Sequence, residues 1–172
     1  AVGGIAKGQI VREIDALGGQ MGIIADKTMI QFRMLNKSKG PAVWSPRVQS
    51  DKFEFATEWR NVLEKTKNLE FWQDQVDSLI VEGDIIRGVH CQMGGDIYSK
   101  TVILTNGTFL NGKIFIGEKS FAGGRISESA SYGITEQLVS LGFEADRMKT
   151  GTPMRIDGRS IDFSKLSEQK GD

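Results

Sequence analysis

At residues 101–108 the chain reads Thr101-Val102-Ile103-Leu104-Thr105-Asn106-Gly107-Thr108. The first five residues are almost all apolar or β-branched, which is typical of a strand buried on both faces, as in a parallel sheet. In open α/β sheets, ligands bind just beyond the carboxyl ends of such strands, and a glycine there lets the backbone approach a cofactor. A simple tight turn explains the three residues after the strand equally well.

Short strands separated by turns precede this stretch. Residues 69–82 and 85–92 have strand patterns and are joined by the turn Glu82-Gly83-Asp84, and Gly94-Gly95-Asp96 leads into residues 97–99. Consecutive strands with tight turns pair antiparallel. The sequence therefore predicts an α/β fold that contains a small antiparallel β meander.

A helix is predicted near the start of the chain. Residues 5–17 carry Ile10, Ile14 and Leu17 on one apolar stripe at helical spacing. The apolar residues further on are less decisive, because residues 29–35 fit either a strand or a short helix.

Two more helices are predicted from their end signals. One opens at Ser45-Pro46, with serine as the N-cap and proline in the first turn, and runs to about residue 66. The other is indicated by Ile134, Leu138 and Leu141 at helical spacing, with Ser131 as its N-cap and Gly142 as its stop.

Composition and charge exclude several classes of protein. The 172 residues include 22 basic and 22 acidic side chains, so there is no global electrostatic reason to bind nucleic acid, although a local basic patch stays possible. A single cysteine, Cys91, excludes an intramolecular disulfide and a cysteine-based zinc site, and we expect no metal site. With no long apolar run and no leader segment, we expect a cytoplasmic protein that does not contact membranes.

Glycines and basic residues suggest binding of phosphates. Gly3-Gly4 precede the first predicted helix, where backbone N–H groups can bind an anion, although glycine pairs are common there for structural reasons. Arg33, Lys37, Lys39 and Arg47 form a basic cluster that can grip phosphates but is more often a solvated loop. No G-x-G-x-x-G fingerprint follows a strand, so we expect an incomplete part of a dinucleotide-binding domain.

No catalytic residue is assigned. His90 and Cys91 are adjacent on a predicted strand and therefore point to opposite faces, so a structural role is favoured for both. Ser131 is not set in a G-x-S-x-G motif, which argues against a serine nucleophile.

Several motifs stand in order along the chain. They are Gly3-Gly4-Ile5-Ala6-Lys7-Gly8, Gln31-Phe32-Arg33-Met34-Leu35-Asn36, Arg47-Val48-Gln49-Ser50-Asp51, Leu104-Thr105-Asn106-Gly107-Thr108-Phe109-Leu110, Gly123-Gly124-Arg125 and Lys149-Thr150-Gly151-Thr152-Pro153. Together they resemble the motifs of the MnmG (GidA) family from one end of the chain to the other.

The resemblance implies part of a Rossmann-like FAD/NAD(P)-binding domain with a small antiparallel β insert. It implies a flavoenzyme that binds FAD, takes reducing equivalents from NADH and uses methylenetetrahydrofolate. With the GTPase partner MnmE, such enzymes build an aminomethyl or carboxymethylaminomethyl group at C5 of the wobble uridine of tRNA. The resemblance also implies a homodimer.

Site residues follow from the resemblance by position. Val76 and Ser131 match FAD contacts of the family, Val76 through its backbone to the adenine edge and Ser131 through its hydroxyl. Lower-ranked FAD candidates come from the strand end and from the first helix, and are Asn106, Gly107, Thr108, Gly3, Gly4 and Lys7. The basic side chains expected to contact tRNA are Lys37, Lys39, Arg47, Arg125 and Lys149.

The predicted domain division has four parts. Residues 1–68 hold the FAD-domain helices and the basic loop, and residues 69–100 form the meander. Residues 101–110 are the return strand of the FAD domain, and residues 111–172 are loop-rich with one helix.

Some family features are expected outside this sequence. We expect the FAD fingerprint and the C-N-P cysteine upstream of Ala1, and the second motif cysteine, the NAD segment and the partner-binding tail beyond Asp172. Cys91 matches neither motif cysteine. The isolated 172 residues are therefore expected to be inactive and to bind FAD weakly or not at all.

Two other functions stay open. One is a non-catalytic RNA-binding module that uses the basic side chains. The other is a related folate- and FAD-dependent tRNA methyltransferase, against which the R-x-Q-x-D stretch at Arg47 and the KTGTP stretch at Lys149 argue.

Overall fold

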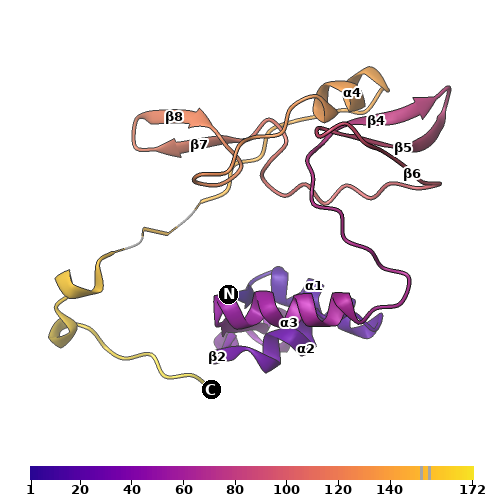
Figure 1. Cartoon of the computed structure of the whole chain (residues 1–172). Helices are drawn as coiled ribbons and strands as arrows, with labels where there is room; N and C mark the ends of the chain where they lie inside the picture. Colours follow the sequence, from indigo (N-terminus) through magenta and orange to yellow (C-terminus); the bar gives the residue numbers. More distant parts are fainter. Residues whose placement is uncertain (152, 155) are drawn as a thin grey trace. The chain divides into compact units, whose positions relative to one another are not determined.

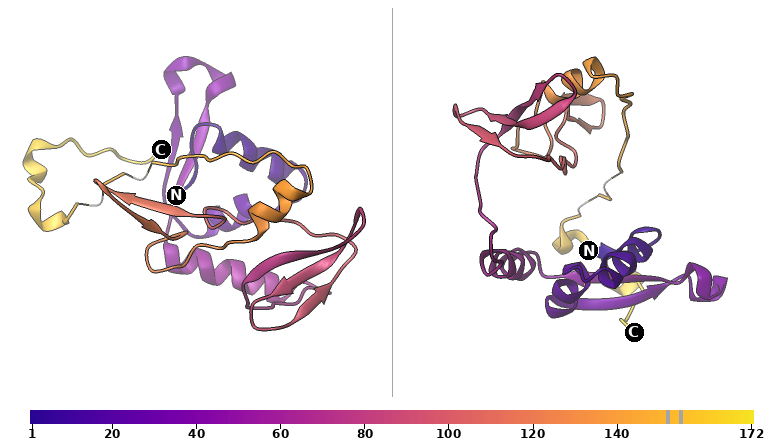
Figure 2. Two further views of the ribbon diagram at one scale, coloured as in Figure 1. Left: turned by 90° about the horizontal axis from the view of Figure 1, so that it is seen from above. Right: turned by 90° about the vertical axis from the view of Figure 1, so that its right-hand side faces the viewer.

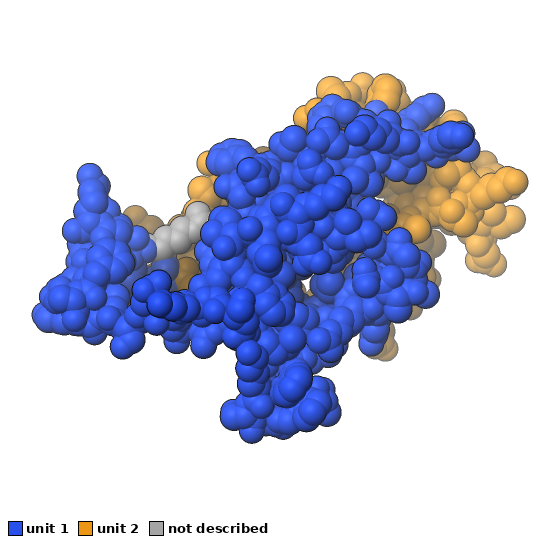
Figure 3. All heavy atoms as spheres, turned by 90° about the horizontal axis from the view of Figure 1, so that it is seen from below, with its two compact units in different colours: residues 1–71, 154–172 blue, residues 72–153 orange. Residues whose placement is uncertain are grey.

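The computed structural model describes residues 1–151, 153–154 and 156–172, which form two compact units (Figures 1 and 3). Unit 1 combines residues 1–71 with 154–172, and unit 2 comprises residues 72–153. Thr152 of the KTGTP motif lies outside the described residues. The finer division into four parts stays a prediction.

Unit 1 is built on a three-stranded antiparallel sheet in the order β1-β3-β2. Its strands are β1 (Val2–Gly3), β2 (Met29–Leu35) and β3 (Ser45–Ser50). Its helices are α1 (Lys7–Ala16), α2 (Met21–Lys27) and α3 (Lys52–Glu64). Helices α1 and α2 contact each other and β3, and α3 contacts α2. The first predicted helix is thus confirmed, and the ambiguous segment is a strand.

Close packing of α1 on β3 depends on glycine. A Cβ atom at Gly3 would lie 2.2 Å from the carbonyl oxygen of Pro46, and Gly3 has a φ of +84°. A Cβ atom at Gly8 would lie 2.9 Å from Cδ of Pro46. The side chain of Pro46 therefore faces α1, and the buried Val48 and Ile24 complete a small core beside it.

The helix predicted to open at Ser45-Pro46 begins later. Ser45 and Pro46 lie in β3, and the helix starts at Lys52. The Ser45 hydroxyl is fully buried, accepts from Nε2 of Gln9 at 3.0 Å and donates to the carbonyl of Val43 at 3.1 Å, so it caps no helix. Asp51 is the real cap, because its Oδ1 accepts from the backbone N–H groups of Phe53 and Glu54 at 2.8 and 2.9 Å.

Removing this cap should loosen the start of α3. We expect Asp51→Ala to cost about 1 kcal/mol, because two backbone donors lose their acceptor. Amide hydrogen exchange at Phe53 and Glu54 should then speed up roughly fivefold. Asp51→Asn keeps an acceptor and is the matched control. Unchanged exchange in Asp51→Ala would contradict the assignment of the cap.

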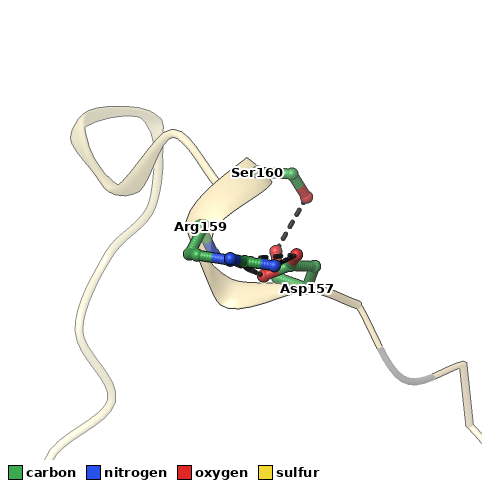
Figure 4. Close-up of polar contacts among 3 residues, drawn as sticks. All are labelled: Asp157, Arg159 and Ser160. Carbon is green, nitrogen blue, oxygen red and sulfur yellow. Dashed lines mark hydrogen bonds and ion pairs between the residues drawn. The ribbon is translucent and has the colours of Figure 1, made fainter.

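The loops of unit 1 contain short 3-10 turns. Between β2 and β3 lie η1 (Lys37–Lys39) and η2 (Pro41–Val43), at the tip of the purple hairpin in Figure 2. The last residues contain η3 (Gly158–Ser160) and η4 (Phe163–Lys165). Figure 4 shows how Asp157 accepts from Nη2 of Arg159 at 2.7 Å. These contacts are local, and almost all described residues after 142 are exposed.

Unit 2 contains the predicted meander. Its strands pair antiparallel in the order β4-β5-β6, and a separate hairpin pairs β7 with β8. The bounds are β4 (Val76–Glu82), β5 (Ile85–Cys91), β6 (Asp96–Tyr98), β7 (Lys113–Ile116), β8 (Lys119–Ala122) and α4 (Ile134–Ser140). The meander and the last helix are confirmed, and the β7–β8 hairpin was not predicted. No helix in the described part of the chain is long and apolar enough to cross a membrane.

The strand predicted for residues 101–105 does not form. None of the described strands pairs with this segment. The side chain of Ile103 is 85% exposed and that of Leu104 is 38% exposed, so neither face is buried as predicted. The reason is that a strand exists only through a hydrogen-bonded neighbour, whatever the apolar content of the segment.

The meander carries the only histidine of the chain. Nδ1 of His90 lies 2.6 Å from Oδ1 of Asp96, and the Tyr98 hydroxyl donates to Oδ2 of Asp96 at 3.2 Å. The hydrogen bond with Asp96 raises the pKa of His90, and the same bond lowers the pKa of Asp96. The pair therefore stabilises the folded meander when histidine is protonated and aspartate is ionised.

This pair predicts a defined pH dependence. The contribution of His90 to the free energy of unfolding is fully present below its unfolded-state pKa of about 6.5. It is lost as the pH rises through the higher folded-state pKa. The contribution of Asp96 is present above its unfolded-state pKa of about 3.9 and is lost as the pH falls through the lower folded-state value.

An NMR titration of the single imidazole checks this directly. We expect a pKa above the ordinary value in the unchanged protein, and a return toward about 6.5 in Asp96→Asn. Glu82→Gln, at the other end of the meander, should leave the pKa of His90 unchanged. If the pKa of His90 is unchanged in Asp96→Asn, its hydrogen bond with Asp96 is not the cause of the raised value.

Candidate functional site

A groove of about 620 Å³ in unit 2 brings together three predicted FAD contacts. Val76 of β4, Asn106 and Ser131 all line it, although they are far apart in the sequence. Apolar side chains from the meander and from α4 form much of the remaining wall, among them Val89, Ile97 and Ile134. The segment predicted as a strand forms another part of the wall, since residues 101–106 line the groove.

Main-chain hydrogen bonds place Ser131 in this wall. Its N–H donates to the carbonyl of Phe109 at 2.9 Å, and its carbonyl accepts from the N–H of Asn111 at 2.8 Å. Residues 110 and 131 thus form an isolated parallel bridge. The backbone of Ser131 is fully used, so only its side chain is available to a ligand.

The Ser131 hydroxyl has almost no partner. The residue is 9% exposed, and its Oγ reaches the carbonyl of Val76 only at 3.5 Å, the outer limit for a hydrogen bond. A buried hydroxyl without a good partner costs free energy, which a ligand that accepts or donates there would recover. Ser131 was also predicted as the N-cap of the last helix, and this is wrong, because Gly133 is the cap.

The turn between Ser131 and α4 is held by a carboxylate. Glu136 accepts from Nδ2 of Asn111 at 2.6 Å and from the N–H of Gly133 at 3.0 Å. The bond from Asn111 is the main reason why the pKa of Glu136 is lowered. Gly133 has a φ of +102°, and a Cβ atom there would lie 2.7 Å from the carbonyl of Asp77, so only glycine fits.

A second contact fixes α4 on the meander. The Gln137 side chain accepts from the N–H of Leu79 and donates to its carbonyl, each at 2.6 Å. Since β4 is an edge strand, this amide pairs with its open side as a neighbouring strand would. Val76 and Ser131 are therefore held in a fixed relation to each other.

The charge of the groove limits its ligand. Among the described residues that line it, Asp74 alone is ionisable, and its two oxygens accept from the N–H groups of Gln75 at 2.7 Å and Met93 at 3.3 Å. No basic side chain lines it. The groove suits a neutral, flat heterocycle with polar edges better than a pyrophosphate.

The other residues of the strand end have local roles. Thr108 donates its hydroxyl to the carbonyl of Gly124 at 2.7 Å, and Gly107 lies in a turn with a φ of +56°. Neither lines the groove. The structure therefore brings Asn106 into the candidate site but gives Gly107 and Thr108 the alternative role of a tight turn.

The candidates from the first helix belong to unit 1. Gly3 is required by the backbone of Pro46, and the N–H of Gly4 donates to the same carbonyl at 2.8 Å. Lys7 is the exposed first residue of α1. Their part in cofactor binding stays a prediction.

The basic side chains predicted to contact tRNA differ in whether they already form ion pairs. Nζ of Lys37 lies 2.8 Å from Asp172, and Nη1 of Arg125 lies 3.8 Å from Glu128. Lys39 and Lys149 are exposed, and Arg47 is half-buried in β3. No group of three metal-ligating side chains occurs among the residues that the structure describes.

Three residues that organise the groove were not predicted. Glu136 stands three residues after Gly133, a spacing typical of a helix N-terminus. Its capping contact could therefore have been predicted from the sequence. The contacts of Asn111 and Gln137 have no sequence signature, because their partners lie 25 and 58 residues away.

Comparisons with known proteins identify the family. The family described as "Glucose inhibited division protein A" matches residues 1–172. A relative from Flavobacterium johnsoniae, named "tRNA uridine 5-carboxymethylaminomethyl modification enzyme MnmG", is 67% identical over 172 residues, which is all of this chain and 28% of that protein. One of the same name from Cytophaga hutchinsonii is 63% identical over the same shares.

Solved structures agree. GidA of Aquifex aeolicus matches with a TM-score of 0.89 and 48% identity, over 99% of this chain and 28% of that one. A GidA-related protein from Thermus thermophilus matches less closely, with a TM-score of 0.50 and 28% identity over 56% of this chain. The α/β fold and the resemblance of the motifs are thereby confirmed, and the chain belongs to the glucose inhibited division protein A (GidA, MnmG) family.

Proposed function

We propose that this chain is part of an FAD-dependent enzyme that modifies the wobble uridine of tRNA at C5. The observation that carries the proposal is the family match over the whole sequence, with relatives named for tRNA uridine 5-carboxymethylaminomethyl modification. The chain spans 28% of the length of those relatives, so the activity belongs to a longer protein. The described residues contribute one wall of its cofactor site.

The groove of unit 2 fits one part of FAD. It offers a neutral pocket, the poorly satisfied hydroxyl of Ser131 and the backbone of Val76, which suit the adenine end of the cofactor. A bound flavin supplies hydride transfer, and the protein supplies position. Val76 would orient the ring, Ser131 would bind a polar edge, and Asn106 would close the rim. The pyrophosphate must be held by other residues, because this groove has no cation.

The further partners follow from the family alone. We include NADH as the reductant, methylenetetrahydrofolate as the carbon donor, the GTPase MnmE as a partner and a homodimeric assembly in the cytoplasm. The isolated 172 residues are proposed to be inactive, because they correspond to 28% of the length of the related enzymes.

Substitution of Ser131 in the whole protein tests the FAD site. Ser131→Leu fills the groove, so we expect the purified protein to lose the visible absorbance of bound flavin. Ser131→Ala keeps the space but removes the hydroxyl, and should weaken FAD binding by about twofold to tenfold.

The matched control is Ser120→Leu, because Ser120 is exposed on β8 and does not line the groove. It should keep a full complement of flavin. If Ser131→Leu is folded and still binds FAD stoichiometrically, the groove is not the cofactor site.

A further inference from the structure

One face of the β2–β3 hairpin carries paired arginines. The strand register sets Arg33 directly opposite Arg47, and Gln31 directly opposite Gln49. Side chains at directly opposed positions share a face of the sheet, as do residues two apart on one strand. Because Pro46 faces α1, its neighbour Arg47 points to the other face. The four side chains therefore lie on the sheet face that α1 does not cover.

The two guanidinium groups form no direct ion pair with a described residue. The charge of Arg33 nevertheless acts on the nearby Asp172 carboxyl, whose pKa is lowered mainly by the hydrogen bond from Lys37 and further by Arg33. Like charges at directly opposed positions destabilise a sheet, and proteins normally place a carboxylate beside them. Among the described residues, no ion pair involves Arg33 or Arg47. Arg33 donates only to the neutral amide oxygen of Gln169. An external anion between the arginines would remove their repulsion.

The edge of the same hairpin already binds an oxyanion. The carboxylate of Asp172 accepts from the backbone N–H of Met34 at 2.6 Å and pairs with Nζ of Lys37 at 2.8 Å. This contact shows that the hairpin has donors with the spacing that an oxyanion needs. It also means that a ligand anion would compete with Asp172 for Lys37.

The tip of the hairpin is ordered. The N–H of the Trp44 ring donates to the carbonyl of Lys37 at 3.2 Å, and Nδ2 of Asn36 donates to the carbonyl of Val43 at 3.3 Å. The exposed Lys39 extends from this closed tip. A cation held on an ordered tip loses less conformational entropy on binding than one on a mobile loop.

We propose that Arg33 and Arg47, with Lys39 at the tip, bind consecutive phosphates of an RNA backbone. The guanidinium fork matches phosphate geometry, and the exposed Gln49 beside it adds a neutral donor. Gln31 is already engaged, because its Nε2 donates to the carbonyl of Gln169 at 3.0 Å. The inference rests on the proposed tRNA substrate and assigns a surface for it. It adds Arg33 to the predicted tRNA contacts and leaves out Lys37, which pairs with Asp172.

The test measures tRNA binding to the whole, FAD-loaded protein at several salt concentrations. The double variant Arg33→Gln/Arg47→Gln should bind roughly tenfold more weakly or worse at low salt. The slope of log affinity against log salt should become shallower by about 1.4 to 1.8, since each of the two lost phosphate contacts removes about 0.7 to 0.9. Arg33→Lys/Arg47→Lys should keep most of the slope but lose affinity, because lysine lacks the fork.

Arg12→Gln/Arg60→Gln is the matched control, because it removes the same charge from exposed positions on α1 and α3. It should leave the slope unchanged. If the control and the hairpin variant change the slope equally, or neither changes it, the arginine pair is not an RNA site. If Arg33→Gln/Arg47→Gln instead lowers the flavin content, the anion is a cofactor pyrophosphate and the inference fails. If the unchanged protein does not bind tRNA at all, the proposed function itself fails.

Discussion

The double hydrogen bond between the Gln137 side chain and the backbone of Leu79 holds the candidate site together. It pairs the open edge of β4 with α4 and satisfies both main-chain groups of Leu79 on that edge. Ser131 precedes α4 and Val76 begins β4, so this amide helps to set the distance between the two predicted FAD contacts. Glu136 and Gly133 then fix the turn that joins Ser131 to the helix.

The two units have different electrostatic character. The groove of unit 2 is lined by neutral groups and one carboxylate that accepts two backbone hydrogen bonds. The hairpin of unit 1 instead presents two opposed arginines that form no ion pair with any residue the structure describes. A net charge of zero therefore conceals a local basic face. Neutral pockets select flat, weakly charged rings, and basic surfaces select phosphates. The proposed flavin-dependent enzyme that acts on RNA would need both kinds of surface.

The sequence predicted those parts of the fold that depend on local rules. The meander followed from turn residues at Gly83 and at Gly94-Gly95, and the first helix followed from its apolar stripe. The helix predicted to open at Ser45-Pro46 was wrong because the same two residues also fit a strand. In that strand the carbonyl of Pro46 accepts from the N–H of Gly4. The strand predicted at residues 101–105 was wrong because apolar content indicates only that burial is favourable. Strand pairing also requires a neighbouring strand. Of the site, Val76 and Ser131 came from the family resemblance, whereas the contact of Gln137 spans 58 residues and leaves no local pattern.

The central claim is that Val76 and Ser131 form one wall of an FAD site. A crystal structure of the whole protein with FAD bound tests it most directly. The account predicts cofactor density in the groove, with a polar atom of FAD within hydrogen-bonding distance of the Ser131 hydroxyl and a ring against Val76. Density for FAD elsewhere in the protein, with the groove filled only by solvent, would contradict it.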